Sequence, residues 1–400
     1  MQTIASDFEE HNAEVRRVWE AFNAGKPYRA PITFGINPRF ILLNPAYNPE
    51  GITFEQYTND PQTMLDAQLK FFHFVRHNIV QDQEMGLPKD GWDVYVDLQN
   101  YYEAAWFGCE VRFMPGEVPD TVPLLTDDRK NVLFDRGIPD PFGGPSPADG
   151  LRPAGGIMRK NLDYAEFFAK RRAEGFEYRG KPIRNIALAA MGTDGPFTAA
   201  ANLRGATNIC IDIYEDPDYV RQLLDYITEA TILRIKALRS LKNENLKTQS
   251  WGAADDSIAL LSCDAYREFV LPAHRRLYGT FSEGGPNSIH LCGDSTRHFP
   301  MLRDELNIKS FDTGFPVDFT WLRKTLGPDV TIYGGPSVPL LRDGTPQQVR
   351  DEVRRICETD ILEGGKFVLR EGNNMAPGTP LENIRAMYEA GREFGRLGPQ

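Results

Sequence analysis

The stretch Ser288-Ile289-His290-Leu291-Cys292-Gly293 carries the pattern on which the fold prediction rests. It is a short apolar run that carries His and Cys two residues apart and ends in glycine, as a β-strand does. Side chains two residues apart lie on one face of a strand, so His290 and Cys292 project together from its end. An imidazole nitrogen and a thiolate sulfur are donors that Zn²⁺ prefers. A lone pair of this kind more often marks a buried cysteine beside a hydrogen-bonded histidine, because a metal site needs further ligands.

Runs of this kind recur along the chain and alternate with helix-length amphipathic segments. We expect eight strands, near residues 31–35, 92–98, 186–191, 248–253, 289–292, 310–313, 330–333 and 367–369. The clearest helix begins at Asp216-Pro217, an N-cap followed by proline at the first helical position, and continues as an apolar stripe to Ala230. Further helices are expected over residues 263–281, 346–362 and 380–394. Eight strands alternating with helices predict an α/β protein with a single (β/α)₈ TIM barrel.

The expected barrel occupies most of the chain. We assign residues 1–29 to an N-terminal helical extension and residues 30–400 to the barrel. The main irregularity is a long loop insertion between the second and third expected strands, where residues 114–157 are rich in proline, glycine and aspartate. A long loop without regular structure in a compact domain is a lid, a binding loop or a disordered segment. A lid or mouth-lining loop and a plain surface excursion both stay open from the sequence.

Composition excludes several classes of protein. A net charge of −11 argues against a nucleic-acid or anionic membrane surface as the partner. The sequence holds no run of about 18 apolar residues, so we expect no membrane span. The five cysteines are scattered and odd in number, which does not fit a disulfide framework. We therefore expect a soluble cytoplasmic protein.

Polar residues follow nearly every expected strand, where the active site of a (β/α)₈ barrel lies. These strand-end residues are Asp97, Gln99 and Asn100, Gly192 to Gly195, Asp255 and Asp256, His290, Cys292 and Asp294, Asp312 and Thr313, Gly334 and Gly335, and Arg370 to Asn374. Loops are polar in general, so each residue alone is more often structural than catalytic, and the argument rests on their meeting at one rim. Further ligands beside His290 and Cys292 would come from the following residues: Asp255, Asp256, Asp312, Glu371 or Cys263.

Five segments give the chain a resemblance to a known family. They are Gly195-Pro196-Phe197-Thr198, Phe269-Val270-Leu271-Pro272, Ile289 to Gly293, Gly334-Gly335-Pro336 and Ala376-Pro377-Gly378-Thr379-Pro380-Leu381-Glu382-Asn383-Ile384. With these segments the chain resembles the uroporphyrinogen decarboxylase superfamily, which includes the decarboxylase and zinc- and corrinoid-linked methyltransferases. The resemblance covers most of the chain from about residue 85 and implies one (β/α)₈ barrel.

Within that superfamily the sequence is more similar to the methyltransferases than to the decarboxylase. The arginine cluster of the decarboxylase is reduced to Arg39, its active-site tyrosine aligns with Asn202, and its late histidine aligns with Asn373. The resemblance implies that His290 and Cys292 are zinc ligands. The third ligand of the methyltransferases, a cysteine, also falls at Asn373, so Glu371 or an upstream carboxylate replaces it or this branch has lost the metal.

The resemblance implies a methyltransferase that moves a methyl group from a small methylated substrate to a corrinoid protein, or from that protein to a thiol. Zinc would bind His290 and Cys292, with Glu371 or Asp256 completing the site. Polar roles are expected for Asp97, Asp256, Asn202, Asn373 and Arg370. No Asp-x-His-x-x-Gly corrinoid motif occurs, so a corrinoid would sit on a separate protein.

Two other functions stay open from the sequence. One is a metal-free decarboxylase or lyase for a different carboxylated substrate, in which Asp97, Asp256 and Arg370 act. The other is a non-catalytic ligand-binding barrel, which the missing third ligand permits. A homodimer is also open.

Overall fold

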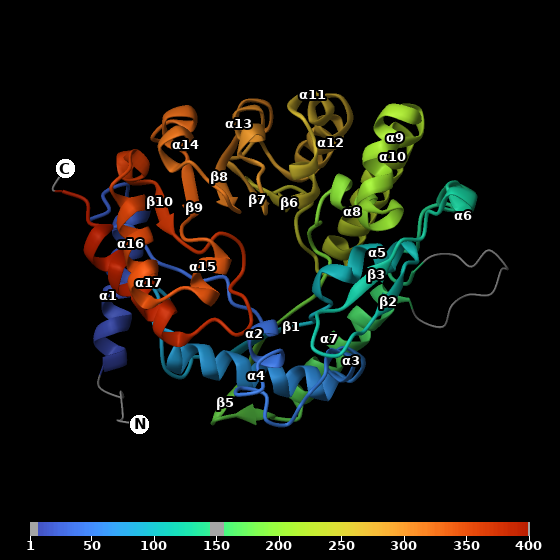
Figure 1. Cartoon of the computed structure of the whole chain (residues 1–400). Coiled ribbons are helices and arrows are strands. Elements are labelled where there is room, and N and C mark those ends of the chain that lie inside the picture. The colour runs from blue at the N-terminus through green and yellow to red at the C-terminus, as the bar shows by residue number, and fades with distance from the viewer. Residues whose placement is uncertain (1–6, 145–155, 399–400) are drawn as a thin grey trace.

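The computed structural model describes residues 7–144 and 156–398 (Figure 1). The strands are β1 Trp92–Tyr95, β2 Glu110–Arg112, β3 Asp120–Val122, β4 Glu177–Tyr178, β5 Lys181–Ala187, β6 Gly252–Ala254, β7 Asn287–Leu291, β8 Ile308–Thr313, β9 Thr331–Gly334 and β10 Phe367–Leu369. The α-helices are α1 Asp7–Asn23, α2 Arg39–Leu42, α3 Phe54–Asn59, α4 Pro61–Asn78, α5 Tyr102–Phe107, α6 Val132–Arg136, α7 Ile157–Ala173, α8 Pro196–Arg204, α9 Ala206–Glu215, α10 Pro217–Leu241, α11 Cys263–Ala265, α12 Leu271–Phe281, α13 Phe299–Leu306, α14 Phe319–Leu326, α15 Val338–Asp343, α16 Pro346–Cys357 and α17 Leu381–Phe394. Short 3₁₀ segments and one π-helical turn complete the described elements: η1 Gln99–Tyr101, η2 Asp127–Arg129, η3 Asp256–Leu260, η4 Tyr266–Val270 (the π turn), η5 Thr296–His298 and η6 Asp360–Gly365.

The second half of the chain forms a five-stranded parallel sheet in the order β10-β9-β8-β7-β6. Successive strands are neighbours because each is followed by helix that returns the chain to the start of the next strand. The register aligns Ile289 with Phe311 and Phe311 with Ile332, and all three side chains are buried. Helices α12, α13 and α14 lie on the outer side of this sheet (Figure 1). This parallel order brings the carboxyl ends of five strands to one edge.

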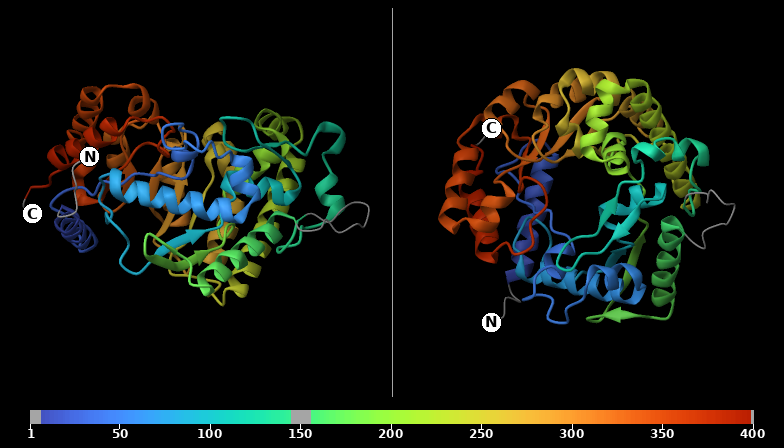
Figure 2. Two further views of the ribbon diagram at one scale, coloured as in Figure 1. Left: turned by 90° about the horizontal axis from the view of Figure 1, so that it is seen from below. Right: turned by 45° about the vertical axis from the view of Figure 1, so that its right-hand side comes forward.

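The first half of the chain contributes a smaller mixed sheet. Strand β1 pairs with β5 in parallel, and β4 pairs with β5 in antiparallel. The backbone N–H of Ala254 in β6 donates to Thr193 O, just after β5, at 3.2 Å. Ile32 forms an isolated parallel bridge with Leu369 of β10. The elements therefore follow one another around a ring, which the right-hand view of Figure 2 shows.

The edge of β1 that faces Ile32 is satisfied by a side chain instead of a strand. The Gln68 amide of α4 donates to Tyr95 O at 2.6 Å and accepts from Tyr95 N at 3.2 Å. A side-chain amide thus takes the place that a neighbouring backbone would have, so these buried peptide groups stay paired.

The Ile32 segment is closed in the same way from the loop after α4. The Asp82 carboxylate accepts from Ile32 N at 2.7 Å, and Gln81 Oε1 accepts from Phe34 N at 2.9 Å. The described backbone pairs therefore form an α/β fold with a parallel sheet and helices, and they do not join into one continuous closed ladder.

The strand boundaries differ from the sequence prediction in the first half. The segment expected as a strand over residues 31–35 is reduced to the bridge at Ile32, because side chains occupy one of its edges. The strand expected at 186–191 lies at 181–187 instead, and its polar residues Lys181, Arg184 and Asn185 hid it from an apolar pattern. From β7 onward every expected strand is present, within two residues at each end.

The insertion between β1 and β5 is not a structureless loop. Strands β2 and β3 form an antiparallel hairpin, and α6 follows it. Alternation in Glu110–Arg112 and Asp120–Val122 is too short to be read from sequence, and the intervening Pro115-Gly116 is a turn signal. Residues 145–155 of the expected loop lie outside the described residues.

The N-terminal helix α1 packs against the loop after α4 and against the end of the chain. Trp19 Nε1 donates to Asp82 O at 2.8 Å, and Glu14 pairs with Arg29 and Arg392. The apolar face of α1 buries Val15, Val18 and Phe22. No helix within residues 7–144 and 156–398 is long and apolar enough to span a membrane.

Candidate active site

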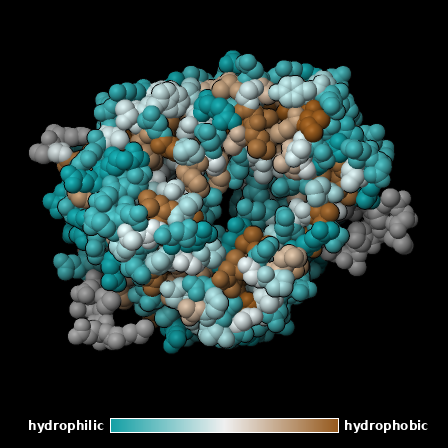
Figure 3. Space-filling view, viewed as in Figure 1, coloured by the Kyte–Doolittle hydropathy of each residue, from teal (hydrophilic) through white to brown (hydrophobic). Residues whose placement is uncertain are grey.

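A polar cleft with a volume of about 830 Å³ lies at the carboxyl ends of the strands. Residues from the loops after five strands line it: Asn100, Asp194, Asp256, Cys292 and Asn373. Residues 117–121 of the β2–β3 hairpin form part of its wall. In the space-filling view the molecule is hollowed near its centre, with hydrophilic and hydrophobic residues both at the edge (Figure 3). The cleft is therefore where the polar strand-end residues meet.

Three potential metal ligands converge on one side of this cleft. His290 and Cys292 come from the end of β7, and His290 Nε2 lies 3.1 Å from Cys292 Sγ. Asp256, at the start of η3, places Oδ1 3.9 Å from His290 Nε2. One ligand atom from each residue lies within 4.8 Å of the other two. This Asp-His-Cys group matches the three-ligand protein set of a catalytic zinc site, which leaves a fourth position for substrate or water.

The backbone also fixes Asp256 against Cys292. Asp256 Oδ1 accepts the Cys292 N–H at 2.7 Å, so the loop after β6 is tied to the end of β7. The i, i+2 spacing on β7 gives the first two ligands, whereas the third depends on the register between β6 and β7, which aligns Ala254 with His290.

Two charged residues, Asp312 and Arg370, orient the imidazole of His290. Its Nδ1 lies 2.7 Å from Asp312 Oδ2 on β8, and the same oxygen accepts from Arg370 Nη1 at 2.7 Å. Burial opposes protonation of His290, but the hydrogen bond and charge of Asp312, with the charge of Asp256, raise its pKa overall. With Nδ1–H directed at Asp312, Nε2 is the nitrogen that faces Cys292 and Asp256, as in carboxylate–histidine–zinc sites.

The Cys292 thiol lies among acids. Burial raises its pKa, and the charges of Asp256 and Asp312 raise it further. Its Sγ donates to Asn373 Oδ1 at 2.9 Å, and Asn373 has a left-handed backbone with φ of 103°. A thiol in such surroundings stays protonated unless a cation sits beside it. The residues present therefore fit a divalent metal by donor type, by spacing and by their surplus of negative charge.

The remaining predicted site residues divide into two groups. Asn202 and Asn373 line the cleft, whereas Asp97 and Arg370 are not among its described lining residues. Asp97 is buried and accepts from Tyr57 Oη at 2.8 Å and from Gln99. Arg370 is held by Asp312. These two residues are thus placed to orient others rather than to touch a ligand.

Two carboxylates and one thiol that the sequence offered as metal ligands lie away from the His290–Cys292 pair. Glu371 is fully buried and accepts the Gly35 N–H at 2.7 Å, away from the described cleft lining. Burial raises the pKa of Glu371 to about 8, against the opposing charge of Arg370. Asp255 caps α8 through Phe197 N and Thr198 N, and Cys263 Sγ lies against Arg297 O at 3.5 Å. The carboxylate at the His290–Cys292 pair is Asp256, not Glu371.

Sequence reasoning gave Asp194 no site role and missed a second contributor to the cleft. Asp194 follows β5 in the Gly192-Thr193-Asp194-Gly195 run, which was expected at the rim only as one of the polar strand ends. The hairpin residues 117–121 were hidden in the proline-rich insertion. The position of Asp194 after a strand was the available signal, because that is the end where active sites of parallel sheets lie.

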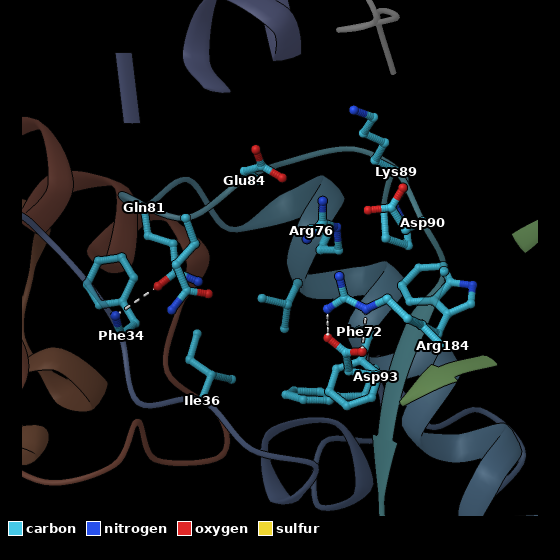
Figure 4. Close-up of a pocket in the computed structure, with 16 residues that line it drawn as sticks. Phe34, Ile36, Phe72, Arg76, Gln81, Glu84, Lys89, Asp90, Asp93 and Arg184 are labelled. Atoms are coloured by element: carbon cyan, nitrogen blue, oxygen red, sulfur yellow. Dashed lines mark hydrogen bonds and ion pairs between the residues drawn. The ribbon is translucent and has the colours of Figure 1, made fainter. Parts of the chain in front are cut away.

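A second cavity of about 520 Å³ lies at the opposite, amino-terminal end of β1 (Figure 4). Trp92 and Phe72 contribute apolar surface, and Arg184 forms an ion pair with Asp93 across it. Gln81, which closes the Ile32 segment, is part of its wall. We call it the rear cavity. The described metal-ligand cluster lies in the cleft and not in the rear cavity.

Comparisons with known proteins agree with this geometry. The model of the family described as uroporphyrinogen decarboxylase (URO-D) matches residues 185–394. A methylated-thiol–coenzyme M methyltransferase from Methanosarcina mazei is 34% identical over 200 residues, which is 50% of this chain and 51% of that protein. A methylcobamide:CoM methyltransferase from Methanosarcina barkeri is 26% identical over 205 residues, 51% of this chain and 57% of that protein.

The match to these curated relatives is partial, because the chain spans about half of their length. The fold match is broader. A solved structure of a methyltransferase from Methanosarcina mazei superposes with a TM-score of 0.61 at 19% identity, over 95% of this chain and 98% of that one. The URO-D model covers the five-stranded sheet together with His290, Cys292 and Asp256. The chain belongs to the uroporphyrinogen decarboxylase family, and over about half of its length it is more similar to the methylated-thiol–coenzyme M methyltransferase, at 34% identity, than to a uroporphyrinogen decarboxylase from Prochlorococcus marinus that matches 46% of this chain and 50% of that protein at 26% identity.

Proposed function

We propose that this chain is a zinc-dependent methyltransferase that moves a methyl group between a small molecule and a corrinoid carried by a separate protein. The observation that carries the proposal is the convergence of Asp256, His290 and Cys292 in the polar cleft. The names of two relatives, which refer to methylated thiols, coenzyme M and methylcobamide, support the choice of reaction.

In this proposal Asp256, His290 and Cys292 hold the zinc. Bound zinc would lower the pKa of a coordinated thiol and would polarise the heteroatom of a methylated substrate. Asp312 fixes the imidazole so that Nε2 faces the site, and Arg370 fixes Asp312. Asn373 takes the place expected for a third thiolate. Its neutral amide contacts Cys292 Sγ, so the carboxylate of Asp256 supplies the negative charge instead.

The charge of the cleft argues against the decarboxylase alternative. Glu117, Asp120 and Asp256 line it, and Arg39 is the one lysine or arginine among the described lining residues. A substrate rich in carboxylates would meet repulsion there, whereas a neutral or cationic methyl donor would not.

The proposal extends to the architecture that holds the site. We infer that the strands belong to one (β/α)₈ barrel over residues 30–400, with residues 1–29 as a helical extension. The ring-like order of the elements, the bridge between Ile32 and Leu369, and the Gln68, Gln81 and Asp82 side chains across the remaining gap support it. A crystal structure with an open sheet edge at β1 exposed to solvent would contradict it.

A methyl-transfer assay with and without zinc tests the function. Methylcobalamin and coenzyme M are mixed with the protein, and loss of the methylcobalamin spectrum reports transfer. We expect zinc-loaded protein to accelerate the reaction, chelation to remove the acceleration and added zinc to restore it. His290→Ala and Cys292→Ala should each lower the rate at least about 100-fold, the scale of losing a group that acts on the reacting atoms.

The reverse direction is tested with chemically reduced cobalamin and a methyl donor, with methanol and 2-methoxyphenol as probes. Formation of methylcobalamin is the signal. A protein that binds zinc yet accelerates neither direction would contradict the proposed function.

A further inference from the structure

The turn Gly192–Gly195, which follows β5, is anchored by a buried ion pair. Arg234 Nη2 of α10 donates to Glu103 Oε1 of α5 at 2.7 Å and to Gly192 O at 2.7 Å. Both side chains are almost fully buried. The Glu103 carboxylate also accepts from Thr193 Oγ1 and from Asp194 N, each at 3.0 Å. Burial of the Glu103–Arg234 pair costs desolvation free energy. Its hydrogen bonds fix the backbone of this turn.

The other side of the turn is fixed by close packing. Gly195 has φ of +100°, and a Cβ on it would lie 2.3 Å from Asp255 Cγ. Asp255 itself is fully engaged, since it accepts from Phe197 N and Thr198 N and contacts His274 Nε2 at 3.0 Å. The turn therefore has one conformation, set by groups from α5, α10 and the loop after β6.

Asp194 is the member of this network that is left without a partner. Its backbone N–H is bonded to Glu103, but its carboxylate has no hydrogen bond or ion pair with any other described residue. Instead it lines the cleft together with Asp256, His290 and Cys292. The neighbouring carboxylates Glu103 and Asp255 each accept several hydrogen bonds. The carboxylate of Asp194 is instead partly exposed and faces the cleft.

The charged and titratable groups around Asp194 are Glu103 and Tyr102 from α5, Arg234 from α10, Asp255 and Asp256 from the loop after β6 and from η3, and Arg39 from α2. The carboxylates among them favour the protonated form of Asp194, and the arginines oppose it. Burial raises the pKa of Asp194 to about 8, and the charges of Glu103 and Asp256 act in the same direction against Arg234. An acid that keeps its proton near neutral pH can donate it to a ligand.

We propose that Asp194 is the catalytic acid that protonates the oxygen or nitrogen atom from which the methyl group departs. This inference rests on the proposed function. In the step, the bond between the methyl carbon and the heteroatom breaks and its electron pair stays on the heteroatom. That atom takes the proton from an Asp194 Oδ, and the electron pair of the reduced corrinoid forms the new bond to the methyl carbon. The products are the methylated corrinoid, the Asp194 carboxylate and the protonated leaving group, which is water from methanol, an alcohol or phenol from an ether, and ammonia or an amine from a methylamine.

The substrate class follows from this role. A proton donor helps when the leaving group is a poor one, as in an alcohol, an ether or a neutral methylamine. It gives no help when the methyl acceptor is a thiol already ionised by zinc. We therefore assign the cleft to neutral methyl ethers, methanol or methylamines as donors.

The test compares Asp194→Asn with the wild type on two probe reactions. With 2-methoxyphenol or methanol and reduced cobalamin, the variant should be at least about 100-fold slower, the usual size of a general-acid contribution. With methylcobalamin and coenzyme M, whose thiol needs no proton donor, the loss of rate should be much smaller. The wild-type rate on the neutral donors should fall as pH rises through the pKa of Asp194, and the variant should lack that fall.

A readout that needs no turnover tests the same point. Infrared difference spectra of wild type minus Asp194→Asn should show the C=O band of a protonated carboxyl at pH 7, and the band should vanish at high pH. Equal zinc content and an unchanged melting temperature show that the variant is folded. Absence of the band, or equal loss of rate on both probe reactions, would overturn the assignment of Asp194. Failure of the wild type on both reactions would instead reject the proposed function.

Discussion

The cleft and the rear cavity lie at opposite ends of the same strands and treat their charges differently. In the cleft, three ligand groups crowd together and Asp194 has no partner among the described residues. In the rear cavity, Asp93 pairs with Arg184, and Gln81 is bonded to the backbone of Phe34. Charged groups that have hydrogen-bond or ion-pair partners serve the fold. Charged groups that crowd together or lack a protein partner mark a ligand site. The comparison places function in the cleft and structure in the rear cavity.

A matched pair of substitutions breaks or sharpens this comparison most strongly. Asp256→Asn and Asp93→Asn both replace a carboxylate by an amide, one in each region. We expect Asp256→Asn to weaken zinc binding at least about 100-fold, because a direct ligand should matter no less than an orienting one. Asp93→Asn should leave zinc affinity within about twofold. Competition with a chromogenic chelator measures both, and equal affinities of the two variants would contradict the distinction.

A smaller loss is expected when the orienting carboxylate is removed. Asp312→Asn leaves all three ligands in place but removes the charge that holds His290 and Arg370. Zinc affinity should fall about 10- to 100-fold, the range seen for such partners. The same chelator competition measures it. A loss as large as that of Asp256→Asn would mean that Asp312 does more than orient His290 and also binds the metal.

The cleft should also respond to pH in a way that the rear cavity does not. Zinc needs a neutral His290 and an ionised Cys292, and both groups have raised pKa values. Zinc binding therefore displaces protons, and affinity should rise with pH by up to about tenfold per pH unit for each proton displaced. Titrations between pH 6 and pH 8 measure the slope. A flat profile would mean that the site does not use these two groups.

Stability should report the rear cavity. Gln81→Met removes the acceptor for Phe34 N and leaves a buried N–H unpaired, which costs about 1–3 kcal/mol in the free energy of unfolding. Zinc affinity should not change. Urea unfolding with zinc titration on the same sample checks both quantities, and a loss of zinc without a loss of stability would reverse the roles of the two regions.

The smallest expected effect concerns Glu371, which is next to the cleft but outside its described lining. Its pKa of about 8 in the folded protein lies above the ordinary value of 4.5. The folded state thus holds the proton more tightly, and stability falls as pH rises from about 4.5 to 8. Glu371→Gln, which cannot ionise, should remove this fall in stability and leave the free energy of unfolding nearly unchanged at pH 4. Loss of zinc binding in this variant would restore Glu371 as a ligand.

The sequence predicted the half of the fold in which each strand carries buried apolar residues in a short run. Strands β7 to β10 are of that kind, and the spacing of His290 and Cys292 on β7 was visible from strand periodicity. The third ligand was not determined, because the position of Asp256 depends on how β6 registers against β7. Glu371 and Asp256 were both offered to complete the site, and Glu371 accepts the Gly35 N–H instead.

The first half of the chain could not be predicted in the same way. Its gap is closed by the side chains of Gln68, Gln81 and Asp82, and nothing in a helical or loop sequence marks an amide that will pair with a strand. Strand β5 exposes polar residues and lacks the apolar run, so it was placed several residues late. The role of Asp194 depends on the buried Glu103–Arg234 pair, whose members are 131 positions apart.

The central claim is that Asp256, His290 and Cys292 bind zinc, and X-ray absorption at the zinc edge tests it most directly. Protein purified with added zinc and then dialysed should keep one zinc per chain. The spectrum should show one sulfur at about 2.3 Å and nitrogen and oxygen ligands at about 2.0–2.2 Å. The sulfur shell should disappear in Cys292→Ser. It should remain in the control variant Cys263→Ser, because Cys263 lies against Arg297. A protein that retains no zinc, or a zinc site without sulfur, would contradict the account.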